Sequence, residues 1–392
     1  MPKHRKLSAL VLALAVILVL SACGVVKKRS TLTDTSSSLP PRTVSATEAY
    51  LSIEDPLLRG TGTPAYWPPA YKQSEPGTFL NNDYRITEVA LTPVTYGAQQ
   101  LYRLNDTDYL ISKPDEESDN IKTAMTNRAN SLKLLSQQNP QVQFYTYFIN
   151  RATNCNWYGR TANIFAYDYA AYFKSLLANS GITSGAFTLS SLGDYMETGY
   201  KLDFHLNHIG AHRAYREIYQ LLSRDMPMTP MKQPLREVDY NSLRTIGQTV
   251  QNPGSADIAE SAMDIFKTYK FDYGSFTSYV DDRQVVLGME EEYDQGQINR
   301  DPAFQHLFSF YGGQTGVVRF EFDQPERPNL LMLSDSQGRP LRKLLASHFN
   351  RTIYLDDVQT NSLDLNRIIQ DNDIDVVVLV GQISLFQSYT GG

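Results

Sequence analysis

The chain has 392 residues, with 42 acidic side chains against 36 lysines and arginines and a formal net charge of −6. An acidic balance argues against a nucleic-acid partner, because nucleic acid requires a basic face. The length is ample for one large α/β domain or two small ones.

The N-terminus predicts an exported, lipid-anchored protein. A basic head, residues 1–6, precedes an apolar run over residues 7–20, which is too short for a comfortable membrane span. The stretch Leu-Ser-Ala-Cys that ends at Cys23 resembles the bacterial lipobox, which implies cleavage before Cys23 and diacylation of its thiol. Membrane lipid is therefore an expected partner, and we expect an extracytoplasmic protein anchored to the bacterial cell membrane. The alternative is an ordinary signal peptide in which Cys23 has no special role.

Cleavage changes the charge and the cysteine chemistry of the mature chain. Residues 1–22 carry three basic residues and no acidic ones, so the formal charge falls to −9. Acylation of Cys23 leaves Cys155 alone, which excludes an intrachain disulfide and a zinc site built on cysteines. Residues 23–75 are rich in Ser, Thr, Pro and Gly and predict a linker, with a folded domain over 76–392.

Strands and helices alternate along the predicted domain. The hydrophobic patterns predict strands at 85–95, 100–112, 141–150, 329–336, 351–357 and 374–382, and helices at 117–139, 163–181, 339–349 and 363–373. Helices between short apolar strands are typical of βαβ units. We therefore predict a three-layer α/β/α fold with a central, mostly parallel sheet.

Ser334, Asp335 and Ser336 fall between an apolar strand and a helix, where parallel sheets bind their ligands. A serine in such a turn exposes its hydroxyl beside backbone N–H groups that can hold an oxyanion. The alternative is that these residues simply cap a helix.

Three of the six histidines, His205, His208 and His212, lie within eight residues of each other, just after Asp203. An acid two residues before a histidine can orient the ring of a general base, which a serine nucleophile requires. A structural role for His205 is the alternative. His208 and His212 have the spacing of metal ligands on a helix, but no acidic ligand accompanies them, so we expect no metal.

Two motifs resemble the DHHW proteins of bacterial cell envelopes. "LDFHLNHIGAHRAY", residues 202–215, is similar to the pattern T-D-H-H-W-T-x-x-G-A, and "LLMLSDSQGRPLRKLLASHF", residues 330–349, is similar to L-L-x-x-G-D-S-F. "FSFYGGQTGVV", residues 308–318, resembles the Gly-Gly segment that precedes the second motif. Phe204, Leu206 and Ser334 depart from the patterns at His, Trp and Gly.

The resemblance implies an SGNH-hydrolase-like domain related to the alginate O-acetylation proteins. Carried over by position, it implies that Ser336 is the nucleophile, His205 the general base and Asp203 the residue that orients His205. Leu206 and Ser334 replace the Trp and the Gly of these patterns, and the resemblance implies that these replacements affect the floor of the substrate site and the oxyanion hole.

The function implied is an O-acetyltransferase or acetylesterase acting on an extracellular polysaccharide, with a membrane-bound acyl-donor protein as a possible partner and no cofactor. Asn150, Arg151 and Arg339 are the candidates for substrate contact, and clusters of tyrosine could stack on sugars or pack as half-buried faces. The alternative is a non-catalytic glycan-binding or scaffold lipoprotein.

Overall fold

The fold is known from a computed structural model, which describes residues 91–96, 99–104, 107–112, 115–149, 167–189, 191–201, 203–244, 264–285, 310–311, 317–356 and 363–387. These residues all belong to one compact unit. The predicted signal segment 1–22, the linker 23–75 with Cys23, and the candidate residues Asn150 and Arg151 lie outside the described residues.

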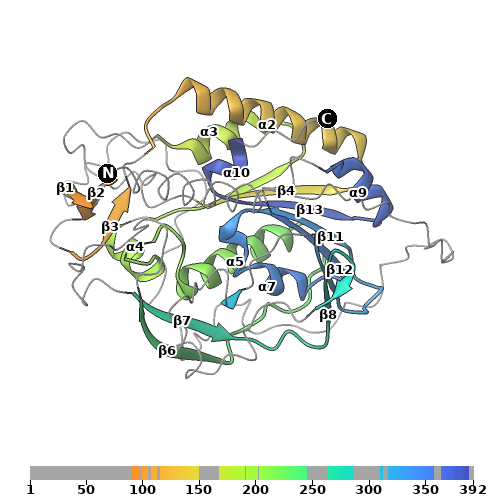
Figure 1. Ribbon diagram of the computed structural model, residues 1–392. Helices are drawn as coiled ribbons and strands as arrows, with labels where there is room; N and C mark the ends of the chain where they lie inside the picture. The colour runs from red at the N-terminus through yellow and green to blue at the C-terminus, as the bar shows by residue number, and fades with distance from the viewer. Residues whose placement is uncertain are drawn as a thin grey trace, which may run out of the picture. The chain divides into compact units, whose positions relative to one another are not determined.

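An eight-stranded sheet forms the centre of the fold (Figure 1). Its spatial order is β5 (Thr183–Phe187), β4 (Gln143–Ile149), β13 (Val376–Gly381), β11 (Leu330–Ser334), β12 (Arg351–Asp356), β10 (Val318–Glu321), β8 (Thr277–Val280) and β9 (Arg283–Gln284). The first five strands are parallel to one another, and β10, β8 and β9 extend the sheet with antiparallel pairings. The predicted central, mostly parallel sheet is confirmed.

Helices cover both faces of the sheet (Figure 1). One face packs against α2 (Asp119–Gln138), α3 (Tyr169–Leu176), α9 (Leu365–Asp371) and α10 (Ile383–Gln387), and the other against α5 (His208–Leu222) and α7 (Arg342–Ala346). The predicted three layers are therefore present. Within the described ranges, no helix combines the length and the apolar character that crossing a bilayer requires.

The side chains of the central strands explain why helices cover both faces of the sheet. In β4, Phe144 and Phe148 join the core under α2 and α3, while Tyr145 and Tyr147 join the core under α5. Because successive side chains of a strand point to opposite faces, a strand that is apolar at every position needs a layer on each side. β11 and β13 are buried along their whole length for the same reason.

The segment after β11 differs from the single helix predicted at 339–349. It forms a short 3₁₀ helix, η5 (Ser336–Gly338), followed by α7. Pro340 lies between the two and has no backbone N–H, so it cannot continue a helical hydrogen-bond ladder. The 3₁₀ turn therefore begins directly at Ser336.

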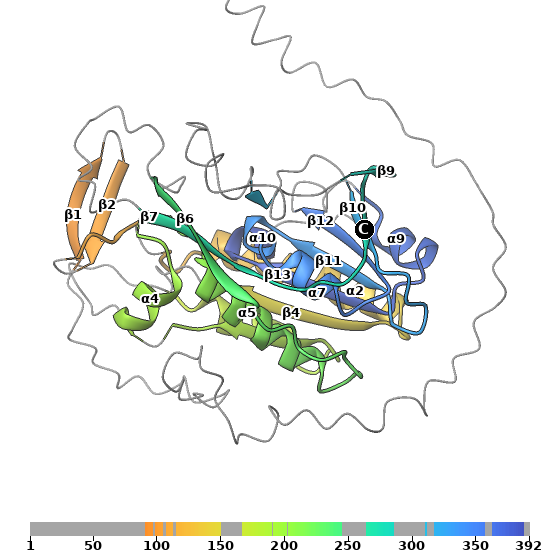
Figure 2. The same ribbon diagram turned by 90° about the horizontal axis from the view of Figure 1, so that it is seen from below.

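Three smaller elements flank the sheet. β1 (Leu91–Tyr96), β2 (Gln99–Leu104) and β3 (Leu110–Ser112) form an antiparallel meander, and the short helix α4 (Leu192–Thr198) precedes the loop to α5. β6 (Arg236–Arg244) and β7 (Asp264–Lys270) pair as an antiparallel ribbon beside α5 (Figure 2).

Candidate active site

The turn that carries Ser336 is fixed by Asp335. One carboxylate oxygen of Asp335 accepts the backbone N–H of Gln337 at 2.9 Å, and the other accepts the backbone N–H of Gln382 at 2.7 Å. Gln382 follows β13, so this carboxylate ties together the ends of two neighbouring parallel strands. Burial raises the pKa of Asp335, against the two N–H bonds that lower it. The capping role considered from the sequence therefore belongs to Asp335, which caps η5. Ser336 is the first residue of that 3₁₀ helix.

Ser334, which stands where the resembling motif has glycine, is accommodated inside the fold. Its side chain is fully buried, and its hydroxyl donates to the carbonyl of Val380 on the neighbouring strand at 2.5 Å. The space for this side chain exists because residue 338 is glycine: a Cβ there would lie 1.9 Å from Ser334 Oγ. The Ser334 hydroxyl is thus engaged with β13.

Asp203 holds His205 through a local turn. Its Oδ1 accepts both the backbone N–H of His205 at 2.8 Å and the ring Nδ1–H at 2.5 Å. A side chain that bonds the backbone two residues ahead is an Asx turn, which fixes the loop as well as the ring. Both side chains are about 2% exposed. The ring of Phe204 stacks on the His205 ring with centroids 4.3 Å apart.

His205 and Ser336 meet across 131 residues of sequence, with His205 Nε2 2.7 Å from Ser336 Oγ. The structure therefore brings the carboxylate, the imidazole and the hydroxyl into one continuous hydrogen-bonded chain. In this arrangement Nε2 can take the hydroxyl proton while Nδ1–H stays bound to the carboxylate.

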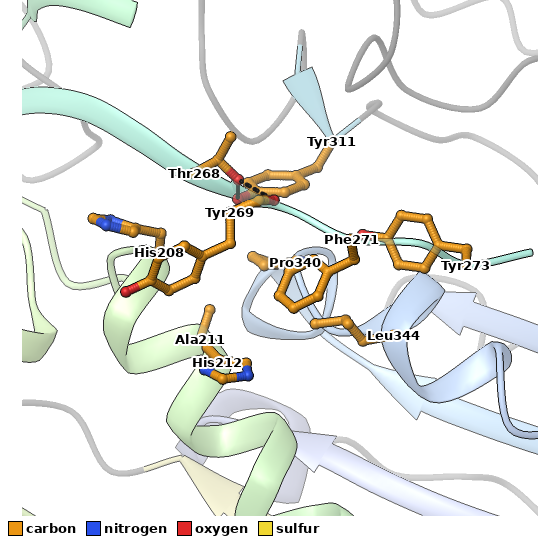
Figure 3. Close-up of a pocket in the computed structure, with 10 residues that line it drawn as sticks. All are labelled: His208, Ala211, His212, Thr268, Tyr269, Phe271, Tyr273, Tyr311, Pro340 and Leu344. Atoms are coloured by element: carbon orange, nitrogen blue, oxygen red, sulfur yellow. Dashed lines mark hydrogen bonds between the residues drawn. The ribbon is translucent and has the colours of Figure 1, made fainter. Parts of the chain in front are cut away.

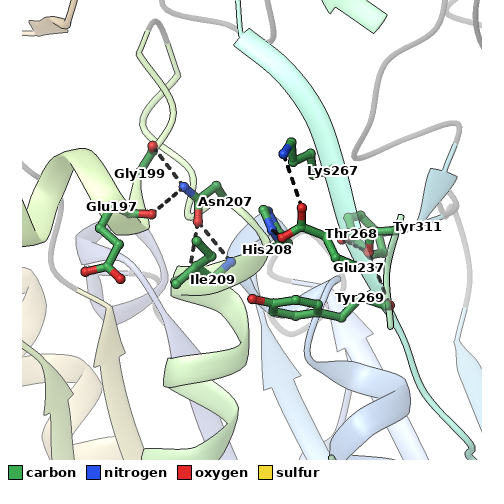
Figure 4. A network of polar contacts seen from close by, with 11 residues as sticks. Glu197, Gly199, Asn207, His208, Ile209, Glu237, Lys267, Thr268, Tyr269 and Tyr311 are labelled. Atoms are coloured by element: carbon green, nitrogen blue, oxygen red, sulfur yellow. Dashed lines mark hydrogen bonds and ion pairs between the residues drawn. The ribbon is translucent and has the colours of Figure 1, made fainter. Parts of the chain in front are cut away.

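Asn207 anchors the loop that carries His205 to the start of α5 (Figure 4). Its side-chain oxygen caps the helix by accepting the N–H groups of Ile209 and Gly210, both at 3.0 Å. Its amide nitrogen donates to the carbonyls of Glu197 and Gly199 at the end of α4. Asparagine is a favoured N-cap residue, and that preference is the sequence signal that could have identified this anchor.

The other two histidines of the cluster have separate environments. His208 Nε2 lies 3.0 Å from Glu237 Oε2 on β6, and Lys267 of β7 pairs with the same carboxylate at 3.1 Å (Figure 4). His212 is packed against the rings of Tyr269 and Phe271, and burial lowers its pKa to about 4. Among the described residues, no three potential metal ligands lie together.

A small pocket lies between α5, β7 and the segment after Ser336 (Figure 3). Its walls are aromatic and include Tyr269, Phe271, Tyr273 and Tyr311, with His208 and His212 on the side of α5. The cavity measures about 20 Å³. A single water needs about 10–15 Å³ by this measure, so the space is about the size of one water. Tyr269 and Tyr273, from the tyrosine cluster at 267–279, line this pocket.

Arg339 lies three residues after Ser336, but its guanidinium is buried, with 7% of the residue exposed. Its Nη2 pairs with Asp356 Oδ2 at 3.0 Å, at the end of β12. This ion pair connects the turn to the neighbouring strand. His348 is likewise buried, between Tyr215 and Thr229, far in sequence from the first histidine cluster.

Sequence reasoning missed Gln337. Its buried carboxamide donates to the carbonyl of Phe204 at 3.1 Å and accepts the N–H of Leu206 at 3.3 Å. No sequence spacing or motif predicts this contact, because it joins segments more than a hundred residues apart. The resembling motif has phenylalanine at this position.

No protein-family model and no curated protein matches this sequence. Among solved structures, a DHHW family protein from Eubacterium siraeum aligns with a TM-score of 0.52 and 16% identity over 77% of this chain and 96% of that one. Bacillus cereus PatB1 aligns with a TM-score of 0.56 and 17% identity over 76% and 97% of the two chains. The same protein with a sulfonyl adduct aligns with a TM-score of 0.54 and 18% identity over 76% and 99%. At such identities the likeness shows the fold alone: this chain shares the three-layer α/β/α fold of these structures.

Proposed function

We propose that this protein catalyses acyl transfer through a covalent intermediate on Ser336. The observation that carries the proposal is the hydrogen-bonded chain from Asp203 through His205 to the Ser336 hydroxyl. A serine hydroxyl becomes a useful nucleophile when a base takes its proton and a third group holds that base. All three groups are present, and the two that must stay in place are buried.

The proposed reaction has two half-reactions. His205 Nε2 takes the proton of the Ser336 hydroxyl as Oγ attacks the acyl carbonyl of the donor. The C–O bond to the leaving group then breaks, and His205 returns the proton to the departing oxygen. In the second half, His205 takes a proton from the acceptor hydroxyl, which attacks the acyl-enzyme, and the proton finally returns to Ser336 Oγ. The backbone N–H of Ser336 donates to the carbonyl oxygen as it becomes negative.

We further propose that the acyl group is acetyl and that the protein acts on the O-acetyl groups of an extracellular polysaccharide. Support comes from the resemblance of residues 202–215 and 330–349 to DHHW motifs and from the shared fold. A sugar hydroxyl as acceptor makes the protein an O-acetyltransferase, and water makes it an esterase. Both outcomes use the same acyl-enzyme. In transfer the proposed acetyl donor is a membrane-bound protein, and in hydrolysis the acetylated polysaccharide itself supplies the acetyl group.

Hydrolysis of an aryl acetate tests the proposal. We expect the wild type to release the phenol and Ser336→Ala to fall to the uncatalysed background. Ser347→Ala is a control for the loss of a serine hydroxyl outside the triad, because Ser347 is buried and its hydroxyl donates to the backbone carbonyl of Leu344. It should retain wild-type turnover. A folded wild type that never turns over would assign the protein to the non-catalytic glycan-binding or scaffold class.

We also propose that Cys23 is acylated and holds the mature protein on the outer face of the cell membrane. The support is the contiguous basic head, apolar run and Leu-Ser-Ala-Cys stretch. Cys23→Ser should release the protein to the medium or periplasm, or leave the precursor unprocessed. If Cys23→Ser fractionates with membranes and migrates like the wild type, the proposal is wrong.

A further inference from the structure

The carboxamide of Gln337 spans the two peptide groups that flank His205. Its Nε2 donates to the carbonyl of Phe204 at 3.1 Å, and its Oε1 accepts the N–H of Leu206 at 3.3 Å. The two backbone partners fix the orientation of the amide, since a carbonyl can only accept and an N–H can only donate. The side chain is 4% exposed, so these bonds form away from bulk water.

Gln337 is itself held in place by the turn that carries the nucleophile. Its backbone N–H donates to Asp335 Oδ1 at 2.9 Å, and it follows Ser336 directly in the 3₁₀ turn η5. Gln337, the residue after Ser336, therefore forms hydrogen bonds to the loop on both sides of His205. This contact joins the turn that carries Ser336 to the loop that carries His205.

The resembling family has neither of the two residues that meet here. Its pattern has histidine where this chain has Phe204, and phenylalanine where this chain has Gln337. In this chain the Phe204 ring stacks on His205, while the Phe204 carbonyl accepts the bond from Gln337. The Phe204 ring thus contacts the imidazole itself, whereas Gln337 bonds the peptide groups on either side of His205.

We propose that Gln337 is a positioning residue for the general base. Its carboxamide clamps the His205 loop so that Nε2 stays within hydrogen-bond reach of Ser336 while Nδ1–H stays on Asp203. The inference rests on the proposed acyl-transfer function for its catalytic consequence. The clamp on the loop is a structural property that can be measured separately.

Gln337→Met tests the clamp, because methionine has a similar length and cannot form either bond. A displacement of about 1 Å at a reacting group costs about 10²-fold in rate. We expect kcat for an aryl acetate to fall by about that factor with KM little changed. Asn139→Leu is the control. Asn139 is a buried amide that bonds Leu135 and Asn366. It lies before the amino end of β4, whereas Ser336 follows the carboxyl end of β11, at the opposite ends of the parallel strands. The control variant should lose stability but keep kcat.

Gln337→Glu gives a second readout that a merely structural role would not move. A protonated carboxyl group can donate to the Phe204 carbonyl and accept from the Leu206 N–H, whereas an ionised one cannot donate. The rate of Gln337→Glu relative to wild type at the same pH should therefore fall as pH rises. A relative rate that is flat across the pH range, or a Gln337→Met variant with wild-type kcat, would overturn the proposal.

An NMR measurement separates this inference from the proposed function. The Nδ1–H of His205, in its 2.5 Å bond to Asp203, should give a low-field proton resonance in the full chain labelled with ¹⁵N-histidine. Loss or exchange broadening of this resonance in Gln337→Met supports the clamp even if the wild type has no turnover. A resonance unchanged from wild type in a folded Gln337→Met variant contradicts the clamp, whatever the activity.

Discussion

Gly338 and Ser334 provide a test of how the nucleophile turn is packed. A Cβ at position 338 would lie 1.9 Å from Ser334 Oγ and 2.5 Å from Ser334 Cβ, separations that real atoms do not tolerate. The third neighbour is Met332 Cε at 3.1 Å, the far end of a flexible side chain that can move. Gly338→Ala should therefore conflict with Ser334 in particular, and replacing Ser334 by glycine should remove the conflict.

The magnitudes follow from these contacts. Overpacking a well-packed core costs about 1–3 kcal/mol. Displacing the Ser334 side chain also removes the acceptor of its buried hydroxyl, the Val380 carbonyl, at a further cost of about 1–3 kcal/mol. Gly338→Ala alone should thus lower the free energy of unfolding by roughly 2–6 kcal/mol. Ser334→Gly alone should cost about 1–2 kcal/mol through the lost hydrogen bond and the extra freedom of glycine.

A double-mutant cycle by urea unfolding measures the coupling. If the conflict is local, Gly338→Ala with Ser334→Gly together should be more stable than the sum of the single effects by about 1–3 kcal/mol. Strictly additive free energies would refute the reasoning, because they would mean that the strain at position 338 does not arise from Ser334. Unchanged stability in Gly338→Ala would refute the close approach itself.

Two further predictions concern the histidines and their partners. Asp203→Asn should slow aryl acetate hydrolysis by up to about 10⁴-fold, because the amide permits the wrong tautomer of the base; His208→Asn, measured alongside, should keep most of the rate, since His208 bonds Glu237 instead. Burial lowers the pKa of His212 to about 4 and that of His348 to about 3, so both stay neutral in the folded protein until acidic pH. The unfolded chain binds these protons below its ordinary histidine pKa of about 6.5, so the free energy of unfolding should fall between pH 6.5 and 4 by up to about 1.4 kcal/mol per pH unit for each histidine. Urea unfolding at several pH values measures this change of the free energy of unfolding with pH. His348→Gln should make the change smaller by the contribution of one proton, and an unchanged pH dependence would contradict the lowered pKa of His348.

The layered fold was predictable because its signals are local and strong. β4, β11 and β13 are apolar at nearly every position, and only a strand covered on both faces tolerates that pattern. The antiparallel extension by β10, β8 and β9 was not predicted. These strands are short, and their burial alternates or is partial, so their sequences resemble loops.

The proximity of Asp203, His205 and Ser336 was expected from sequence, although only the first two are neighbours in the chain. The Asp-x-His pattern can be recognised in the sequence, because a short turn can bring its two side chains together. The bond from Gln337 to the Phe204 carbonyl and the bond from the Gln382 N–H to Asp335 were not predicted, because each joins segments brought near by the sheet topology. The pairing of Arg339 with Asp356 also depends on the neighbouring strand β12 and was not predicted.

Covalent labelling of Ser336 tests the central claim most directly. PatB1 of Bacillus cereus, which shares the fold, has been solved with a sulfonyl adduct, so a sulfonyl fluoride is a suitable probe. After treatment of the full chain and proteolysis, mass spectrometry should find one adduct, on the peptide that contains Ser336. The adduct should be absent from Ser336→Ala and should form much more slowly in Asp203→Asn. A folded wild type that never labels, or an adduct that persists in Ser336→Ala, would contradict the account.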